Sequence, residues 1–226
     1  MGKLIVIEGT DGSGKQTQVK LLKERLSGEE YSVLDLSFPQ YGKKSAGLIE
    51  EYLNNKYGAP DRVNPYAASL FFAVDRFDAS ENLRELLKAN DLILLDRYVD
   101  SNAGHQGGKI ADAGEKERFL EWLYDIEYNK LQVPKPDLVI VLRVPAEIGQ
   151  KLVSQKHARA YLDKGTHDGH EMDLRHLKNA EASYLALAER FAENHAIIEC
   201  VENGKLLAPE IINEKIYQLL KNKQLV

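Results

Sequence analysis

The chain has 226 residues, 43% of them hydrophobic and 29% charged, a composition that suits one globular domain spanning residues 1–226. Its net charge of −5 argues against a general nucleic-acid-binding surface, so any phosphate site has to be local. The single cysteine excludes an internal disulfide, and the lack of a signal peptide or of a roughly 20-residue apolar run favours a cytoplasmic protein without a membrane span.

The first predicted strand, residues 4–7, leads into a glycine-rich turn and then into the start of a helix. Residues 9–17 have the sequence GTDGSGKQT, with the G-x-x-x-x-G-K spacing of a phosphate-binding loop, or P-loop. In such a loop, backbone N–H groups and the helix N-terminus surround an anion, and the lysine, here Lys15, reaches the outer phosphates. The strand before the turn and the helix after it favour a nucleoside triphosphate site over an ordinary glycine turn.

One position of the P-loop departs from the usual pattern. Ser or Thr normally follows the lysine and holds Mg²⁺, but Gln16 stands there, and an amide oxygen is a bulkier and poorer ligand. Thr17 or a water molecule is an alternative ligand. The predicted triphosphate-binding residues are Gly9, Thr10, Asp11, Gly12, Ser13, Gly14, Lys15, Gln16 and Thr17.

Apolar spacing and turn residues predict the next elements. A helix extends to Gly28, a strand covers residues 32–38, and a helical stretch lies around residues 48–53. Pro65 then starts a longer helix that continues to about residue 88. Within that helix an apolar stripe is expected to face the core, and its members are Leu70, Phe71, Val74 and Phe77.

Two residues of the long helix lie beside this stripe. Phe72 and Arg76 are four positions apart and therefore share a face. An aromatic ring next to a guanidinium suits a flat heteroaromatic base, which the ring stacks on and the guanidinium binds at the edge. Alternatively, Phe72 is a second core aromatic and Arg76 a surface charge. The spacing alone does not decide between the two.

The third predicted strand, residues 91–96, is an unbroken apolar run between carboxylates, as in a central parallel strand. Asp96 ends this strand at the edge where ligands bind in open α/β sheets. Beside a P-loop, Asp96 is a candidate carboxylate for Mg²⁺ and Arg97 a candidate phosphate clamp. A loop is expected over residues 99–114, followed by a helix over residues 115–129.

The last part of the chain completes a five-stranded α/β pattern. Residues 154–170 lack a continuous apolar stripe and are rich in Lys, Arg and His, which predicts a lid. The histidines of residues 167–176 have no cysteine nearby, so helix capping by Asp and Glu is favoured over a structural zinc site. Cys200 is expected to be inert core. Strands are predicted over residues 138–144 and 195–201, and helices over residues 145–153, 171–193 and 208–222.

Together these residues resemble the thymidylate kinase family of P-loop nucleoside monophosphate kinases over nearly the full length of the chain. The most specific match is Asp96-Arg97-Tyr98 with Ser101, paired with the F-x-x-x-R segment of the long helix. Further matches are residues 8–15, Phe38-Pro39, His105-Gln106 and Pro136-Asp137-Leu138. The resemblance implies an α/β, three-layer P-loop kinase fold with a five-stranded parallel sheet flanked by helices and a lid segment.

The resemblance also implies a reaction, the Mg²⁺-dependent transfer of the γ-phosphoryl group of ATP to dTMP, giving dTDP and ADP, by a homodimer. In the family, residues that match Phe72 and Arg76 contact thymine. Residues that match Arg97 and Asp11 contact the acceptor phosphate and the deoxyribose. The implied substrate-binding residues are Asp11, Phe38, Pro39, Phe72, Arg76, Arg97, Ser101, His105 and Gln106.

The implied mechanism needs no general base, because the attacking phosphate oxygen is already ionised at neutral pH. Catalysis then consists of positioning and of charge neutralisation by the loop lysine, Mg²⁺, the arginine after the third strand and a lid cation. The loop, residues 10–13, contains no arginine, which is why a cation from the lid is needed. The predicted catalytic residues are Lys15, Arg97, Asp11 and Arg159, with Lys156 and Lys164 as alternatives to Arg159.

Two alternatives remain open at this point. One is a kinase of another deoxynucleotide or deoxynucleoside, because no spacing in the sequence excludes dUMP or an analogue. Tyr41 also stands where some relatives have a phosphate-binding arginine, and His105 where many have tyrosine. The other is a nucleotide-binding homologue without transfer activity, for which Gln16 is the main support.

Overall fold

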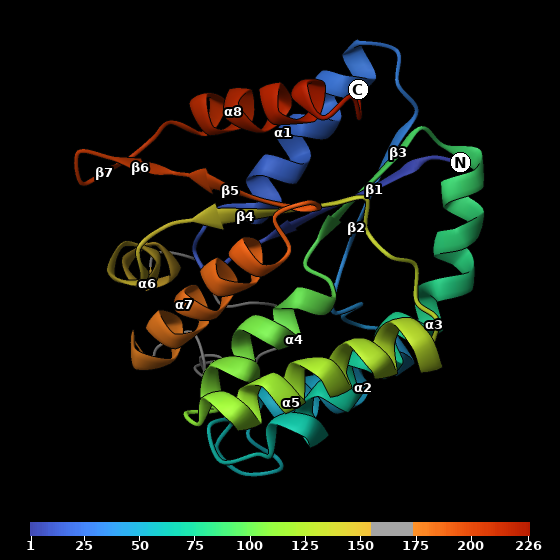
Figure 1. Cartoon of the computed structure of the whole chain (residues 1–226). Coiled ribbons are helices and arrows are strands. Elements are labelled where there is room, and N and C mark those ends of the chain that lie inside the picture. Colours follow the sequence, from blue (N-terminus) through green and yellow to red (C-terminus); the bar gives the residue numbers. More distant parts are fainter. Residues whose placement is uncertain (155–173) are drawn as a thin grey trace.

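The computed structural model describes residues 1–154 and 174–226 of the chain. Its five main strands form one parallel sheet in the order β2-β3-β1-β4-β5, and helices cover both faces (Figure 1). The predicted three-layer α/β fold with a five-stranded parallel sheet is confirmed. The strands are β1 (Lys3–Glu8), β2 (Val33–Ser37), β3 (Leu92–Asp96), β4 (Leu138–Arg143) and β5 (His195–Glu199). The helices are α1 (Lys15–Gly28), α2 (Gly47–Leu53), α3 (Pro65–Ala89), α4 (Val99–His105), α5 (Ala113–Tyr124), α6 (Ala146–Ser154), α7 (Leu174–Arg190) and α8 (Pro209–Asn222).

The central strands are apolar because each of them contributes to two cores. Successive residues of a strand point to opposite faces of the sheet. In β1, Ile5 and Ile7 lie in the core with side chains of α1 and α8, whereas Leu4 and Val6 lie in the core with side chains of α3, α5 and α7. All four side chains are buried, as expected of a parallel strand covered on both faces.

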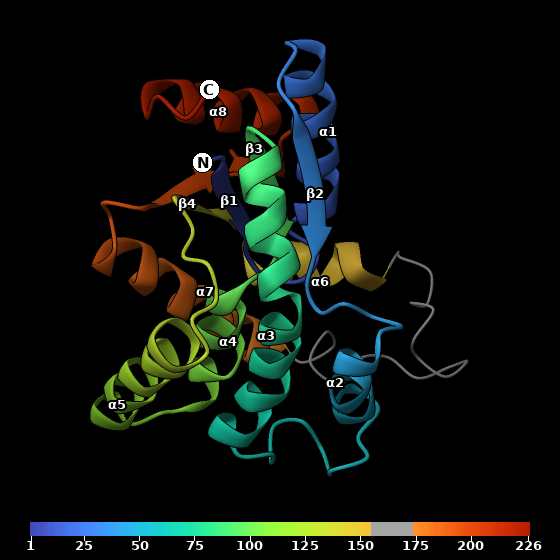
Figure 2. The same cartoon turned by 90° about the vertical axis from the view of Figure 1, so that its right-hand side faces the viewer.

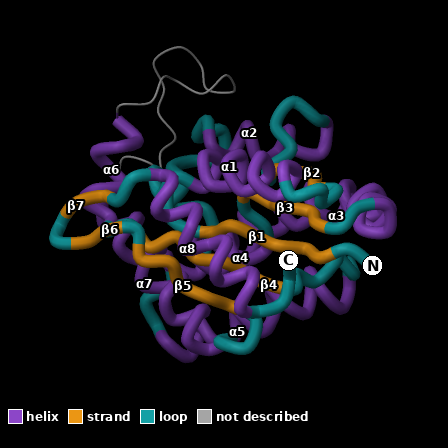
Figure 3. The backbone as a smooth tube through the Cα atoms, turned by 90° about the horizontal axis from the view of Figure 1, so that it is seen from above, coloured by secondary structure: helices purple, strands orange, loops and turns teal. Residues whose placement is uncertain are grey.

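Two smaller parts of the chain lie outside the main layers. The α2 helix packs against α3 rather than against the sheet (Figure 2), and a small core that includes Ile49, Tyr52 and Ala68 lies between them. The short strands β6 (Val201–Glu202) and β7 (Lys205–Leu206) form an antiparallel hairpin beyond β5 (Figure 3). The α2 segment therefore stands beside the carboxyl ends of the strands, where the candidate site is formed.

The predicted loop over residues 99–114 is wrong, because most of this segment is helical. It contains α4, a 3₁₀ helix at Gly107–Lys109 and the start of α5. Its Ser, Asn and Gly residues have weak helix propensity, which favoured a loop, but tertiary contacts outweigh that preference. Asn102 donates to the backbone carbonyl of Ser69 at 3.1 Å, and Gly104 allows the ring of Tyr184 to pack on α4. A Cβ atom at Gly104 would lie 2.7 Å from that ring.

The predicted core stripe of α3 is also wrong. Leu70, Val74 and Phe77 are 42%, 50% and 52% exposed, and of the stripe only Phe71 packs on the small core with α2. The buried positions of this half of α3 are mostly small or polar, and they are Ala68, Ser69, Ala73, Asp75 and Arg76. Apolar spacing identifies a face of a helix but not what covers it. Here the polar face is turned inward because it borders the candidate site.

Other elements follow the prediction with shifted ends. The helix predicted over residues 115–129 consists of α5 and a π-helical segment at Asp125–Lys130. The predicted lid, residues 154–170, lies outside the described residues except for Ser154, the last residue of α6. Cys200 is buried, and burial raises the pKa of its thiol to about 12. Within the two described ranges, no helix is both long and apolar enough to cross a membrane.

Candidate functional site

The P-loop connects β1 to α1 at the carboxyl ends of the strands, the edge where ligands bind in open α/β sheets. Gly12 and Gly14 have φ values of 83° and 87°, a left-handed conformation that glycine adopts at little cost. Gly12 also approaches α6 closely, since a Cβ atom there would lie 2.4 Å from the carbonyl oxygen of Gly149. The loop is therefore held in a glycine-dependent turn between the starts of two helices.

Lys15 is the first residue of α1 and lies inside the loop, only 7% exposed. Its ammonium group donates to the carbonyl oxygens of Gly9 and Thr10, both at 2.9 Å. The pKa of Lys15 is lowered to about 8, mainly by burial and also by the charge of Arg97, while the neighbouring carboxylates oppose this shift. Gln16, by contrast, is exposed, so its side chain is not enclosed by the loop.

Arg97 connects the P-loop to a neighbouring pocket. Its guanidinium forms an ion pair with Asp11 of the loop, and its Nη1 atom lies 3.2 Å from Nε2 of His105. Arg97 follows β3 directly and has a φ of 69°, a left-handed conformation that is strained for a residue with a side chain. Burial lowers the pKa of Arg97, but the charge of Asp11 and further groups outweigh burial and keep this pKa well above its ordinary value. Arg97 is therefore a permanent cation at the junction of loop and pocket.

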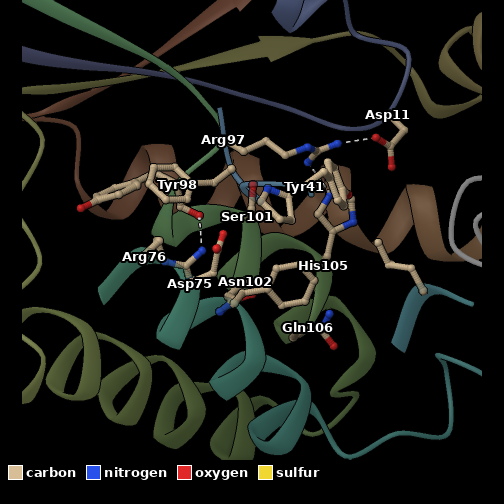
Figure 4. A pocket seen from close by; sticks show the side chains of 14 residues that line it. Asp11, Tyr41, Asp75, Arg76, Arg97, Tyr98, Ser101, Asn102, His105 and Gln106 are labelled. Carbon is tan, nitrogen blue, oxygen red and sulfur yellow. Dashed lines mark hydrogen bonds and ion pairs between the residues drawn. The ribbon is translucent and has the colours of Figure 1, made fainter. Parts of the chain in front are cut away.

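Fourteen side chains line the pocket next to this ion pair (Figure 4). All nine predicted substrate-binding residues are among them, so the structure brings together residues that are up to 95 positions apart, from Asp11 to Gln106. Figure 4 shows Asp11 and Arg97 on one side of the pocket and Arg76 and Gln106 away from them. The lining residues that the sequence did not predict are Tyr41, Leu53, Asp75, Tyr98 and Asn102.

Arg76 is buried at the end of the pocket away from Asp11, so its interpretation as a surface charge is wrong. Its guanidinium forms an ion pair with Glu127, and its Nη1 atom donates to the carbonyl oxygen of Tyr98 at 3.1 Å. Phe72 is half-buried beside it, and its ring meets the ring of Tyr52 edge-on, with 6.1 Å between the centroids. A flat ring and a cation, four positions apart on α3, thus both line the pocket.

Glu8, the last residue of β1, organises the wall of the site. Its buried carboxylate accepts hydrogen bonds from the backbone N–H of Tyr98 at 2.7 Å, from the Ser101 hydroxyl at 2.8 Å and from the Tyr184 hydroxyl at 3.0 Å. Burial raises the pKa of Glu8, Arg97 opposes this, and the hydrogen bonds favour the ionised form. Because the Ser101 hydroxyl is directed to Glu8, Ser101 supports the wall of the pocket in addition to lining it.

The segment after β2 is fixed to α3 by Asp75. The carboxylate of Asp75 accepts hydrogen bonds from the backbone N–H of Gln40 at 2.8 Å and from the Ser45 hydroxyl at 2.6 Å. These contacts place Phe38, Pro39 and Tyr41 along the pocket wall. Asp75 lies inside the matched residues 72–76, so the sequence contained a signal for it. Glu127 and Tyr184 belong to no local motif, and only the fold brings them to the site.

The residues around Asp96 fit a magnesium ion. One carboxylate oxygen of Asp96, Oδ1, is buried and has no hydrogen-bond partner in the described parts of the chain. Its negative charge also raises the pKa of Lys15 in the loop and of Arg97 in the pocket, so it acts on both sites. Within residues 1–154 and 174–226 no three His, Cys, Asp or Glu side chains form a metal cluster. A single carboxylate suits Mg²⁺, which usually keeps several waters and binds to substrate phosphates.

The predicted lid cation lies outside the described residues, as do both of its alternatives; the three residues are Arg159, Lys156 and Lys164.

Comparison with known protein families identifies the chain. The family model for thymidylate kinase matches residues 7–211. The chain belongs to the thymidylate kinase family. It is 34% identical over 188 residues to the thymidylate kinase of Mycobacterium tuberculosis strain H37Rv, an alignment that covers 82% of this chain and 85% of that protein. It is 32% identical over 223 residues to a probable thymidylate kinase of Thermococcus onnurineus, with 96% of this chain and 98% of that protein covered.

The fold is shared with a solved structure of this family. A thymidylate kinase from Candida albicans superposes with a TM-score of 0.75 and 23% sequence identity, covering 99% of this chain and 93% of that chain. At this identity the likeness shows the fold alone. It agrees with the parallel sheet and the strand order described above.

Proposed function

We propose that this protein is a dTMP kinase, which transfers the γ-phosphoryl group of ATP to dTMP and gives dTDP and ADP. The observation that carries the proposal is the ion pair between Asp11 and Arg97. It joins a P-loop that suits a triphosphate to a pocket that has Arg97 on one side and Arg76 away from it, with the ring of Phe72 among the lining side chains. A donor site and an acceptor site are thereby adjacent at one edge of the sheet.

The residues of the donor site bind and orient the phosphates of ATP and supply no reacting group. The N–H groups of the P-loop and the Lys15 ammonium would bind the phosphates of ATP. When bound, Mg²⁺ would neutralise part of the charge on these phosphates, held by Asp96, by water and by phosphate oxygens. Gln16, at the usual ligand position, is exposed and is not assigned as a ligand in this proposal.

The acceptor site orients dTMP for attack. Arg97 would bind the acceptor phosphate, Asp11 would lie near the deoxyribose, and Phe72 would stack on the base. The attacking phosphate oxygen is ionised at neutral pH, so rate enhancement comes from alignment and from charge neutralisation. Because residues 10–13 contain no arginine, we include Arg159 in this proposal as the lid cation, with Lys156 and Lys164 as alternatives. In that case Arg159→Ala lowers kcat much more than dTMP affinity, and an unchanged kcat would remove Arg159 from the mechanism.

We also propose that the protein is a homodimer, on the basis of the exposed apolar face of α3 formed by Leu70, Val74 and Phe77. Three large apolar side chains on one helix face are typical of a surface that another protein covers.

A cytoplasmic location is proposed from the single, buried cysteine, which suits a reducing compartment. Fractionation of the source cells would test that location, and recovery outside the cytoplasm would contradict it.

The test of the reaction is a coupled assay of ADP formation with ATP, Mg²⁺ and each of dTMP, dUMP, dCMP, dGMP and thymidine. We expect turnover of dTMP above that of the others, and loss of turnover in Lys15→Ala with the fold retained. Higher turnover of another acceptor would favour the first alternative, a kinase of a different deoxynucleotide. The solved Candida albicans relative is described as having broad substrate specificity, so this comparison of acceptors is informative.

Gln16 supports a second candidate function, nucleotide binding without transfer. It occupies the usual position of a Mg²⁺ ligand and is exposed. If the wild-type protein binds ATP but transfers no phosphate to any acceptor with Mg²⁺ or Mn²⁺, this second candidate is correct and the kinase proposal is wrong.

A further inference from the structure

At the end of the pocket away from Asp11, the lining residue Arg76 belongs to a buried ion pair that the proposed reaction does not explain. Arg76 is 2% exposed and Glu127 is fully buried. The Nε atom of Arg76 donates to both carboxylate oxygens of Glu127, at 3.1 and 3.2 Å, and Nη2 contacts one of them. The second partner of the guanidinium is the carbonyl oxygen of Tyr98 (Figure 4). Glu127 therefore holds one whole edge of the guanidinium.

The backbone at Glu127 is unusual. Glu127 lies in the π-helical segment Asp125–Lys130, which directly follows α5, and it is the buried residue of that segment. π-Helical turns are rare and often occur at functional sites, because the wider turn changes the direction of the side chains that follow. Here the π turn carries a carboxylate that reaches Arg76 on α3, 51 positions earlier in the chain.

A purely structural role is a weak explanation for this pair. Removing two charges from water is costly, and buried ion pairs can often be replaced by apolar side chains without loss of stability. The charge of Glu127 has a clear local effect: burial lowers the pKa of Arg76, but Glu127 outweighs burial and raises it above its ordinary value. Arg76 thus stays charged while the pair as a whole is neutral. The end of the pocket that Arg76 lines therefore suits an uncharged ring.

The hydrogen bonds of Arg76 leave a defined set of donors. A guanidinium has five N–H groups and no acceptor. Glu127 and Tyr98 bind the Nε–H group, one N–H of Nη2 and one N–H of Nη1. Among the described residues, no acceptor binds the remaining N–H of either terminal nitrogen, and Arg76 lines the pocket. A ring that meets these donors has to present an acceptor to them, such as the carbonyl oxygen that thymine carries where cytosine has an amino group.

We propose that Glu127 is a positioning residue, which fixes the guanidinium of Arg76 so that its remaining N–H groups meet a ring carbonyl of the acceptor base and select thymine over cytosine. This inference rests on the proposed function, because it places the base of dTMP at Arg76. Glu127 itself does not touch the base. Glu127 acts by fixing the direction in which the N–H groups of Arg76 point.

The test compares the wild-type protein with Glu127→Gln, which keeps the size of the side chain but removes its charge. Calorimetric titration without ATP gives the Kd of dTMP and of dCMP, and the coupled assay gives kcat and KM. A disordered donor set should weaken dTMP binding about tenfold, the effect of one hydrogen bond to a charged group. The Kd of dCMP and the KM for ATP should change less than about twofold, so that selectivity for dTMP falls.

Ile216→Ala is a matched control for lost stability. Ile216 is buried on α8, in the core on the opposite face of the sheet from α3. A large-to-small change there should lower the free energy of unfolding by about 2 to 5 kcal/mol without altering the ratio of the two Kd values.

If Glu127→Gln does not fold, Glu127→Asp replaces it, because the shorter carboxylate keeps the charge but loses the reach to both nitrogens. The selectivity of that variant should change in the same direction.

The proposal would be overturned if the Glu127 variant had the same ratio of dTMP and dCMP Kd values as the wild-type protein. This includes the case in which both nucleotides lose affinity equally. Failure of the proposed function has a different signature. In that case the wild-type protein transfers no phosphate, while the two Kd values still decide the role of Glu127. If the wild-type protein binds neither nucleotide, both proposals are wrong.

Discussion

The guanidinium of Arg97 forms an ion pair with the carboxylate of Asp11, across the boundary between the P-loop and the pocket. The two residues come from different strand ends, β1 and β3, which are neighbours in the sheet. An acceptor phosphate that binds Arg97 would share this cation with Asp11. The pair therefore sets the distance between the donor and acceptor sites of the proposed reaction.

Replacing Arg97 should lower activity with either alanine or glycine, whereas the stability of the two variants should depend on the backbone conformation at this position. Both Arg97→Ala and Arg97→Gly should lower kcat/KM for dTMP by roughly a hundredfold or more, because a charged phosphate contact is lost. At ordinary positions Gly is less stable than Ala by about 0.5–1 kcal/mol, but the left-handed conformation reverses this preference. We therefore expect Arg97→Gly to be at least as stable as Arg97→Ala in urea unfolding. A clearly less stable glycine variant would show that the backbone at Arg97 is not strained.

Lys15 should couple ATP binding to proton uptake. Its pKa of about 8 lies below the ordinary 10.5, so the free ammonium loses its proton as the pH rises through about 8. Phosphates favour the charged form and raise this pKa, so ATP binding should take up a proton near pH 8 and weaken above it. Calorimetry in two buffers of different ionisation enthalpy measures the uptake. At about pH 6, where Lys15 is already protonated, this uptake should vanish, and Lys15→Met should lack it at both pH values. Equal uptake in Lys15→Met would assign the proton to another group.

Asp96 should determine the metal requirement. Asp96→Asn keeps the shape of the side chain but removes the negative charge, so the Mg²⁺ concentration for half-maximal turnover should rise about tenfold. Asp35→Asn is the control, because Asp35 is an exposed carboxylate on the neighbouring strand β2 that pairs with Lys23. An unchanged Mg²⁺ requirement in Asp96→Asn would exclude Asp96 as a ligand.

The exposed face of α3 should determine the oligomeric state. Val74→Lys places a charge in the middle of that face and should convert a dimer to a monomer in sedimentation measurements, since burying an unpaired charge is costly. Ile211→Lys on α8 is the matched control, because Ile211 is exposed to a similar degree, 49% against 50% for Val74. A wild-type protein that is monomeric at high concentration would contradict the homodimer proposal outright.

The candidate site was only partly predictable from the sequence. Lys15, Asp96 and Arg97 lie where a glycine-rich turn or an apolar strand ends, and such local patterns can be read along the chain. The roles of Ser101 and Arg76 needed more than the pattern. Ser101 donates to the buried Glu8, and Arg76 is held by Glu127 from a segment with no recognisable motif.

The sequence by itself determined the layered fold and the P-loop, because both depend on short-range periodicity and on glycine conformations. It could not determine which face of α3 is buried, since Leu70, Val74 and Phe77 have the spacing of a core stripe and yet are exposed. It also could not reveal α4, whose residues are weak helix formers that contacts with Ser69 and Tyr184 hold in place. Tertiary structure decided these points, because burial and helix formation there depend on partners distant in the chain.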